Sequence, residues 1–266
     1  MSTIQSYQAQ CALCGKKSKQ TEITSYSNFG YPDLDFRPPS MCRETMDYWV
    51  SECPHCGFVN TDLSEQIDLL PEEISILYKD IESRFDWKRT RYDTGANIPL
   101  RFAKLGAMLA ESDDYEGAVE QFLRVAWNFD DDRDEQSAKY WRKVAIKLAE
   151  LLLFDYPQKN PSDKIICIYA DMLRRTGNFK TVIRLFDNIQ IYDEEFFMMN
   201  EHITMREHLH RMKYYKKFSE QGYRLIKFQK ELTERGDQKT HTTDEVFIPE
   251  DEVDRPEMFY IFPFKL

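Results

Sequence analysis

Long apolar segments are missing from this 266-residue chain. Its apolar runs are short, and Leu151–Phe154, for example, lies between Glu150 and Asp155, whereas a membrane-spanning helix needs roughly 20 apolar residues. The first ten residues are polar and lack the apolar core of a secretory signal. We therefore expect no membrane association and a cytoplasmic location, where disulfides are disfavoured and closely spaced cysteines indicate metal or redox chemistry.

Glycine is scarce, with nine residues, and none of them forms a glycine-rich phosphate loop or a G-x-G-x-x-G fingerprint. The sequence also contains neither the G-x-S-x-G of a hydrolase nor the H-E-x-x-H of a metalloprotease. His202, His208 and His210 do not have the i, i+4 spacing of helical metal ligands. We therefore expect no enzymatic activity, and an enzyme of an unrecognised type stays an alternative.

Positive charge is also deficient, because 36 Lys and Arg face 46 Asp and Glu, which gives a net charge of −10. A general nucleic-acid binder needs a basic face that displaces counterions from phosphates. The acidic excess is uneven: residues 61–98 contribute −4 and residues 241–266 contribute −5. Residues 1–60 are nearly neutral, so they have no basic field, although the overall acidity does not by itself exclude a nucleic-acid contact there.

The cysteines form the most specific pattern in the sequence. Cys11 and Cys14, and again Cys53 and Cys56, form C-x-x-C pairs that are each followed by glycine, and a long intervening segment separates the pairs. Such a knuckle lets two thiolates of one turn reach one ion, and two knuckles supply four sulfur ligands for a closed tetrahedral Zn²⁺ site. We expect a structural zinc whose loss, by Cys53→Ser, unfolds residues 1–62.

Other interpretations of these cysteines are weaker. A redox C-x-x-C normally occurs once, and a catalytic zinc needs an open coordination position that four thiolates do not leave. Iron can bind the same ligands, so the sequence does not exclude it. We expect His55 to point away from the ion, Cys42 to be a loop thiol and Cys167 to be a buried small hydrophobe.

After residue 62 the apolar residues follow a helical period of about 3.6 residues. Strand-like segments occur only before that point, at 21–26 and 48–51. The periodicity, with proline and glycine at the boundaries, predicts helices over 71–92, 98–112, 115–129, 134–156, 162–176, 179–190, and over 193–236 either as one helix or as two broken near Gly222.

Two of the helix pairs share a pattern of small and aromatic residues. Gly106, Leu109, Tyr115, Ala118 and Phe122 in the first pair recur at the same offsets in the second as Ala170, Leu173, Phe179, Val182 and Phe186. This spacing resembles the helix–turn–helix of the tetratricopeptide repeat (TPR), whose period is about 34 residues. An ordinary helical bundle with coincidental spacing is the alternative, since a strict repeat array has a uniform period.

The fold class that follows is mainly α, with a small N-terminal β zinc ribbon, TPR-like helical repeats and a long C-terminal helix. We expect the Met258–Phe264 stretch of the tail to pack on the body or to serve as a docking segment. The expected segments are a zinc ribbon at 1–62, a connecting helix at 63–97, a TPR-like domain at 98–190, a long helical segment at 191–236 and an acidic, aromatic tail at 237–266.

The loop between the knuckles carries paired acids and arginines. Asp33, Asp35, Arg37 and Arg43 are candidates for a ligand or peptide site on the ribbon. The alternative is that such residues pair with each other, cap turns or connect the ribbon to the helices. Trp49, just before the second knuckle, is expected in the core.

Residues 11–59 contain CALCG, YPDLDFRPP and MDYWVSECPHCGF. In these motifs and the helices that follow, the chain resembles a bacterial family of unknown function that joins a two-knuckle zinc ribbon to a TPR-like region. The resemblance covers most of residues 11–190 and implies no activity. We interpret the chain as a zinc-binding interaction protein with a protein or peptide partner, and a nucleic-acid-associated regulator that uses the ribbon is the alternative.

Overall fold

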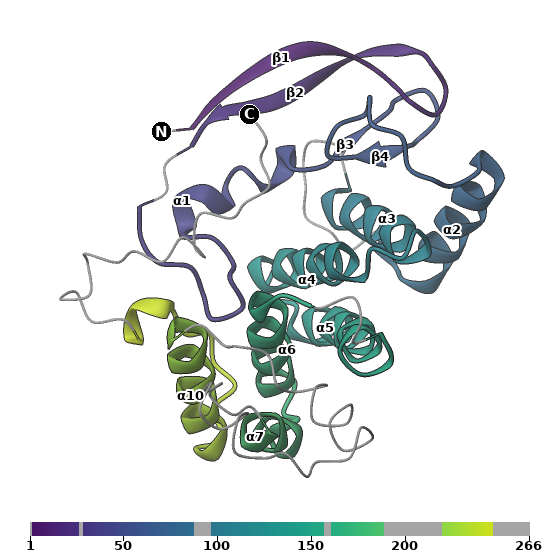
Figure 1. Ribbon diagram of the computed structural model, residues 1–266. Coiled ribbons are helices and arrows are strands. Elements are labelled where there is room, and N and C mark those ends of the chain that lie inside the picture. The colour runs from purple at the N-terminus through teal and green to yellow at the C-terminus, as the bar shows by residue number, and fades with distance from the viewer. Residues whose placement is uncertain (1, 27–28, 88–96, 157–160, 189–219, 247–266) are drawn as a thin grey trace, which may run out of the picture. The chain divides into compact units, whose positions relative to one another are not determined.

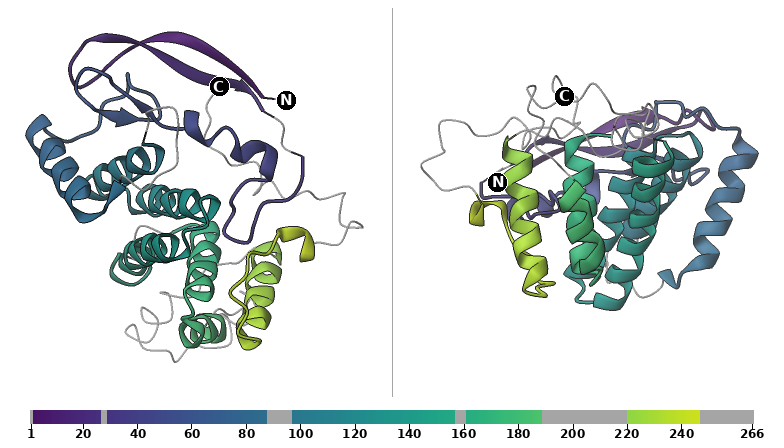
Figure 2. Two further views of the ribbon diagram at one scale, coloured as in Figure 1. Left: turned by 180° about the vertical axis from the view of Figure 1, so that it is seen from behind. Right: turned by 60° about the horizontal axis from the view of Figure 1, so that its bottom comes forward.

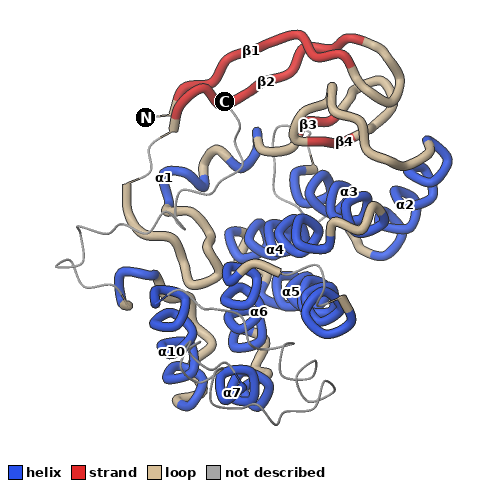
Figure 3. The backbone as a smooth tube through the Cα atoms, viewed as in Figure 1, coloured by secondary structure: helices blue, strands red, loops and turns tan. Residues whose placement is uncertain are grey.

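The computed structural model describes residues 2–26, 29–87, 97–156, 161–188 and 220–246, and these are mainly α-helical, as predicted (Figures 1 and 3). They fall into two compact units. Unit 1 contains the described residues of 1–30 and 38–148, and unit 2 contains those of 31–37 and 149–265. Each unit is described by itself below.

Unit 1 begins with two antiparallel hairpins. Strands β1 (Thr3–Gln10) and β2 (Lys17–Ser25) pair from Gln10 opposite Lys17 to Thr3 opposite Ser25, with one register shift between Thr3 and Ile4. The short strands β3 (Ser51–Glu52) and β4 (Val59–Asn60) form the second hairpin. Between the hairpins lie a one-turn helix, α1 (Ser40–Arg43), and a 3₁₀ turn at Met46–Tyr48.

The helices of unit 1 are α2 (Pro71–Arg84), α3 (Ile98–Glu111), α4 (Tyr115–Asp131) and α5 (Glu135–Glu150), and the last two residues of α5 cluster with unit 2. Figure 2 shows the same elements from two further sides. Helix α4 is the central one, because most of its residues from Ala118 to Phe129 are buried, several polar ones included. Its first turn is capped by Asp114, which accepts a hydrogen bond from the Gly117 N–H at 3.0 Å.

Unit 2 is built from helices α6 (Asp163–Arg175), α7 (Phe179–Asn188) and α10 (Glu220–Glu234). Helix α10 packs against both α6 and α7. A π-helical turn at Leu151–Asp155 precedes them and a 3₁₀ turn at Thr243–Glu245 follows them. The segment Tyr31–Arg37 completes this unit, although it lies more than a hundred positions earlier in the chain.

Two predicted elements differ from those observed. The first helix stops at Arg84 rather than at 92, because Phe85 adopts an extended backbone and its ring lies 5.1 Å from Trp87 and 5.2 Å from Phe129; the end of the prediction, 88–92, lies outside the described residues. The predicted strand at 48–51 is wrong at its start, since Tyr48 ends a 3₁₀ turn and the strand begins at Ser51.

The remaining helix predictions are close to the observed bounds. Helix α10 passes through Gly222 without a break, while the expected stretch 193–219 and the tail segment 258–264 lie outside the described residues. The polar strand β1 is an element that the sequence analysis missed.

The two TPR-like helix pairs are present as α3–α4 and α6–α7. At the first crossing, a Cβ on Gly106 would lie 3.1 Å from the Phe122 ring, so a small residue is needed there. The turns of the two pairs are equivalent, because Asp113 (φ 63°) and Gly177 (φ 83°) both have a left-handed backbone. In each turn the N–H of the following residue donates a hydrogen bond to a leucine carbonyl, that of Leu109 or Leu173. The turn before α5 has the same form at Arg133, so this geometry is a general helix ending, and the TPR interpretation stays a prediction.

Candidate metal centre

The four predicted cysteine ligands lie in the turns of the two hairpins of unit 1. Cys11 and Cys14 connect β1 to β2, and Cys53 and Cys56 connect β3 to β4. Each turn places its first cysteine directly after a strand, where the backbone is fixed by pairing with the next strand. The fold therefore brings together two cysteine pairs that are far apart in the sequence.

The two knuckles have the same backbone hydrogen bonds. The Cys11 N–H donates to the Lys16 carbonyl at 3.0 Å, and the Cys53 N–H donates to the Phe58 carbonyl at 2.8 Å. The glycine that follows each pair donates its N–H to the first cysteine's carbonyl, at 2.8 Å in both cases. Both turns therefore close in the same way, which explains why the sequence motif occurs twice.

Gly15 and Gly57 are required for backbone conformation rather than for space. Their φ angles are +70° and +75°, in the left-handed region that side chains disfavour. An added Cβ would meet no atom within 4 Å at either position. The glycines thus allow the chain to turn back after the second cysteine of each pair.

The sulfur atoms lie close enough together to share one metal ion. All four Sγ atoms lie within 4.8 Å of one another, and the Cys11–Cys56 and Cys14–Cys53 pairs are both 3.7 Å apart. A tetrahedral ion with metal–sulfur bonds of about 2.3 Å needs sulfur–sulfur distances of about 3.8 Å. A disulfide needs about 2.05 Å, so these are free thiols with the geometry of a shared ion.

Backbone N–H groups favour the thiolate form of Cys11 and Cys14, whereas burial raises the pKa of Cys56. A hydrogen bond from the Lys16 N–H lowers the pKa of Cys14 to about 7. Burial raises the pKa of Cys11, and the N–H groups of Cys14 and Leu13 oppose that rise. Since a metal binds the thiolate form, these backbone dipoles favour the species that a cation would hold.

The hairpins that carry the four cysteines are held to the rest of unit 1 by buried and half-buried polar contacts. Glu52, which precedes Cys53, accepts a hydrogen bond from Arg101 of α3 at 3.0 Å. On the other strand of this hairpin, the Val59 N–H donates to the Tyr78 hydroxyl of α2 at 3.0 Å. The first knuckle is fixed as well, because the Ala12 N–H donates to the Leu63 carbonyl at 2.7 Å. These contacts could not be predicted from the sequence, because their partners lie far apart along the chain.

The expectations for His55 and Cys167 agree with the structure, whereas the expected loop thiol Cys42 lies in a helix. The His55 Nε2 lies 3.2 Å from the Lys17 carbonyl, so its ring is directed to β2 and is not among the four clustered ligands. Cys42 is buried in α1, outside that cluster, and burial raises its pKa. Cys167 is buried in α6.

A comparison with protein-family models matches residues 4–209 to "Uncharacterized protein conserved in bacteria (DUF2225)". The chain belongs to the DUF2225 family. The match covers both knuckles and the helices through α7. No curated protein and no solved structure matches the chain. Within the described part of this DUF2225 chain, no helix is both long enough and apolar enough to cross a membrane.

Three of the four candidate partner-binding residues are buried in unit 2 of the DUF2225 chain. Asp33, Asp35 and Arg37 are at most 4% exposed. The Asp35 carboxylate lies 3.5 Å from the Arg175 guanidinium of α6. Arg43, in unit 1, is half-buried and its Nε donates to the Pro38 carbonyl. This burial favours the alternative in which the loop's acids and arginines hold the loop in place.

A substitution at Gly15 tests the backbone role of the knuckle glycines in this DUF2225 chain. We expect Gly15→Ala to weaken metal retention by roughly fivefold, because a Cβ in the left-handed region costs about 1 kcal/mol. The measurement is competition for the bound metal with a chromophoric chelator. Gly15→Asn is the matched control, since asparagine tolerates this conformation, and equal losses in both variants would contradict the argument.

Proposed function

We propose that the chain is a cytoplasmic, zinc-binding interaction protein, in which a structural Zn²⁺ stabilises a scaffold that binds a protein or peptide partner. The observation that carries the zinc assignment is the four-sulfur cluster with two 3.7 Å pairs. Four thiolates close the coordination shell, so the ion has no open position for a substrate. A structural role without catalysis is therefore the proposal that the ligand set supports.

The metal assignment is tested by elemental analysis of protein purified without added metal. We expect one zinc per chain and a colourless solution. Iron bound to the same four sulfurs would colour the protein, because thiolate-to-iron charge transfer absorbs visible light. A coloured, iron-containing protein would replace zinc by iron in the proposal.

The proposed partner-binding role is supported by the helix pairs α3–α4 and α6–α7, which carry the spacing of a repeat family that binds extended peptides on its helical surface. Affinity purification of the full chain from its native host, followed by mass spectrometry, tests it. We expect a reproducible protein partner that also binds the purified chain directly.

The alternatives give different results in the same set of experiments. A bound metabolite in place of a protein partner would favour an enzyme. A gel-shift titration with DNA and RNA, repeated at several salt concentrations, tests the alternative of a nucleic-acid-associated regulator. Tight binding that falls steeply with salt would overturn the interaction proposal in favour of nucleic acid.

A further inference from the structure

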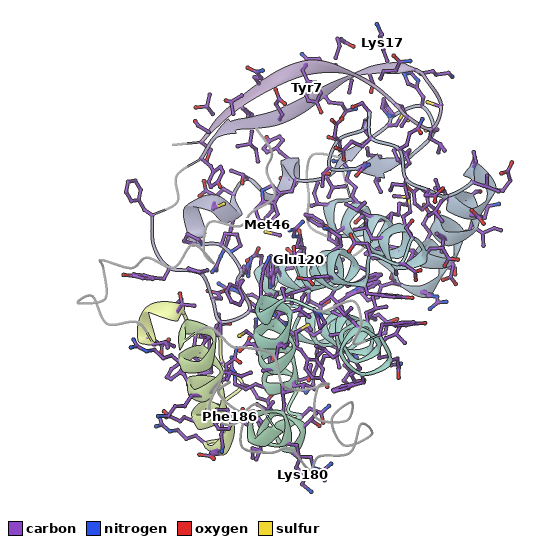
Figure 4. The ribbon with its side chains drawn as sticks, viewed as in Figure 1. Tyr7, Lys17, Met46, Glu120, Lys180 and Phe186 are labelled. Atoms are coloured by element: carbon purple, nitrogen blue, oxygen red, sulfur yellow. The ribbon has the colours of Figure 1, made fainter. Side chains whose placement is uncertain are left out.

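Strand β1 presents one free edge within the part of the chain that the structure describes. Among the described residues, β1 pairs only with β2, in a two-stranded sheet. Figure 1 shows β1 along the border of unit 1, and Figure 4 labels Tyr7 on β1 and Lys17 where β2 begins. Of the residues from Thr3 to Gln10, Tyr7 is half-buried, Ala9 is buried and the other six are exposed. Backbone groups on this side of β1 are therefore available to another strand.

The hydrogen-bond alternation identifies which residues form that edge. In an antiparallel pair, every second residue bonds its partner strand and the others direct their N–H and C=O groups outward. The Cys11 N–H bonds the Lys16 carbonyl, so Ala9, Tyr7 and Gln5 bond β2 in turn. The residues whose backbone N–H and C=O groups point away from β2 are Ile4, Ser6, Gln8 and Gln10.

The features that usually protect an edge strand are largely missing from β1. Natural edges carry lysines, other charges or prolines that discourage pairing. Thr3–Gln10 has the sequence TIQSYQAQ, which contains no charged residue and no proline. Its one irregularity, between Thr3 and Ile4, lies at the far end of the strand.

We infer that β1 pairs antiparallel with β1 of a second copy of this chain, which joins the two hairpins into a four-stranded sheet. An uncharged strand meets its own copy without like charges opposite one another. The charged residues of this sheet, such as Lys17 and Lys19, are on β2. In the dimer the two β2 strands are three strand spacings apart, about 14 Å, which exceeds the screening length of about 8 Å at physiological salt.

The alternation also defines the register. A twofold axis at Tyr7 places Ser6 opposite Gln8 of the other copy, and Ile4 opposite Gln10. The outward N–H and C=O groups of all four residues can then form hydrogen bonds with the outward groups of the other copy. Centring the axis on Ser6 or on Gln8 leaves some of these groups without a partner. The edge is short, so we expect a small interface and a weak dimer.

Sedimentation equilibrium of the full-length, metal-loaded chain tests the inference. The expected mass rises with concentration from 31.8 kDa towards twice that value. Two double variants form a matched pair that differs only at position 6. Ser6→Glu with Gln8→Glu places like charges opposite each other across the twofold axis, and Ser6→Lys with Gln8→Glu places opposite charges there.

We expect the first double variant to weaken the dimer at least tenfold and the second to dimerise as tightly as the natural chain or more tightly. Both changed side chains are exposed. The glutamate introduced at position 8 faces Lys19 of β2 in both variants, so circular dichroism and metal content are the checks for intact folding. A monomer at every concentration would overturn the inference, including the case in which another part of the same chain covers β1. Equal effects of the two variants would also overturn it.

Discussion

Cys53→Ser is expected to abolish metal binding and to unfold the hairpins of unit 1. Cys53 is fully buried and its sulfur lies 3.7 Å from that of Cys14, so replacement by serine leaves only three sulfur ligands. Structural zinc contributes roughly 10–16 kcal/mol of apparent binding free energy in finger-sized units. Two short hairpins have little apolar core of their own to replace that contribution.

The effect should extend beyond the ribbon into α2 and α3. The link runs from Glu52, beside the ligand, to Arg101, and from β4 to Tyr78, whose hydroxyl donates to the Met108 sulfur at 3.4 Å. Loss of the hairpin leaves these groups without their partners, which costs about 1–3 kcal/mol for a buried group such as the Tyr78 hydroxyl and less for the half-buried Arg101. We therefore expect faster amide exchange in the four strands and in α2, with a smaller increase in α3.

Tryptophan fluorescence isolates this response, because all four tryptophans, Trp49, Trp87, Trp127 and Trp141, belong to unit 1. Cys42→Ser is the matched control, since Cys42 is a buried thiol of the same unit that is outside the sulfur cluster. The control should keep one metal per chain. A Cys53→Ser protein with native fluorescence and exchange would show that the ion is dispensable for the fold.

Arg174→Met is expected to destabilise unit 2 by about 3–5 kcal/mol. Arg174 is fully buried in α6 and makes two hydrogen bonds to Asp171, at 2.7 and 3.0 Å, and one to the Asp237 carbonyl at 2.8 Å. Its removal leaves the carboxylate of Asp171, 2% exposed, as an uncompensated buried charge. Breaking a buried pair in this way is far more costly than losing a surface pair.

The measurement is amide exchange in α6 and α10, where protection should fall more than about a hundredfold. Tryptophan emission should stay native, because unit 2 contains no tryptophan. Lys180→Met removes the same charge from an exposed position of α7 and should change stability by less than about 0.5 kcal/mol. In the double variant Asp171→Leu with Arg174→Met, most of the stability should return; a loss equal to that of Arg174→Met would exclude the buried charge as the cause.

The sequence was sufficient where structure is determined locally. The clustering of the four cysteines follows from their spacing and from the conformation that Gly15 and Gly57 allow. Helices were predictable because their caps and periods are also local: Asp114 and Ser162 each cap the first turn of the helix that follows. The predicted helix bounds are therefore close wherever the chain is described, apart from the early end of α2.

What the sequence did not reveal depends on residues far apart in the chain. Strand β1 is polar and gains its order from pairing with β2 rather than from an apolar alternation. The polar residues of the Asp33–Arg37 motif are typical of a surface loop. Yet the Gln229 side chain of α10, 195 positions away, donates a hydrogen bond to the Leu34 carbonyl. Phe85 leaves its helix for an aromatic cluster whose other members include residues of α4 and α5.

The composition of unit 2 also has a consequence for synthesis. Its segment Tyr31–Arg37 leaves the ribosome early, but its partners there include Gln229, His241 and Thr243, whose bonds to Leu34 and Pro32 close the unit. At about 5–20 residues per second, these partners emerge roughly 10–40 s later. During that interval Leu34 and Phe36, both buried in the folded protein, are exposed on the nascent chain. Residues 229–243 must therefore be synthesised before the Tyr31–Arg37 segment can be fully protected from proteases and chaperones.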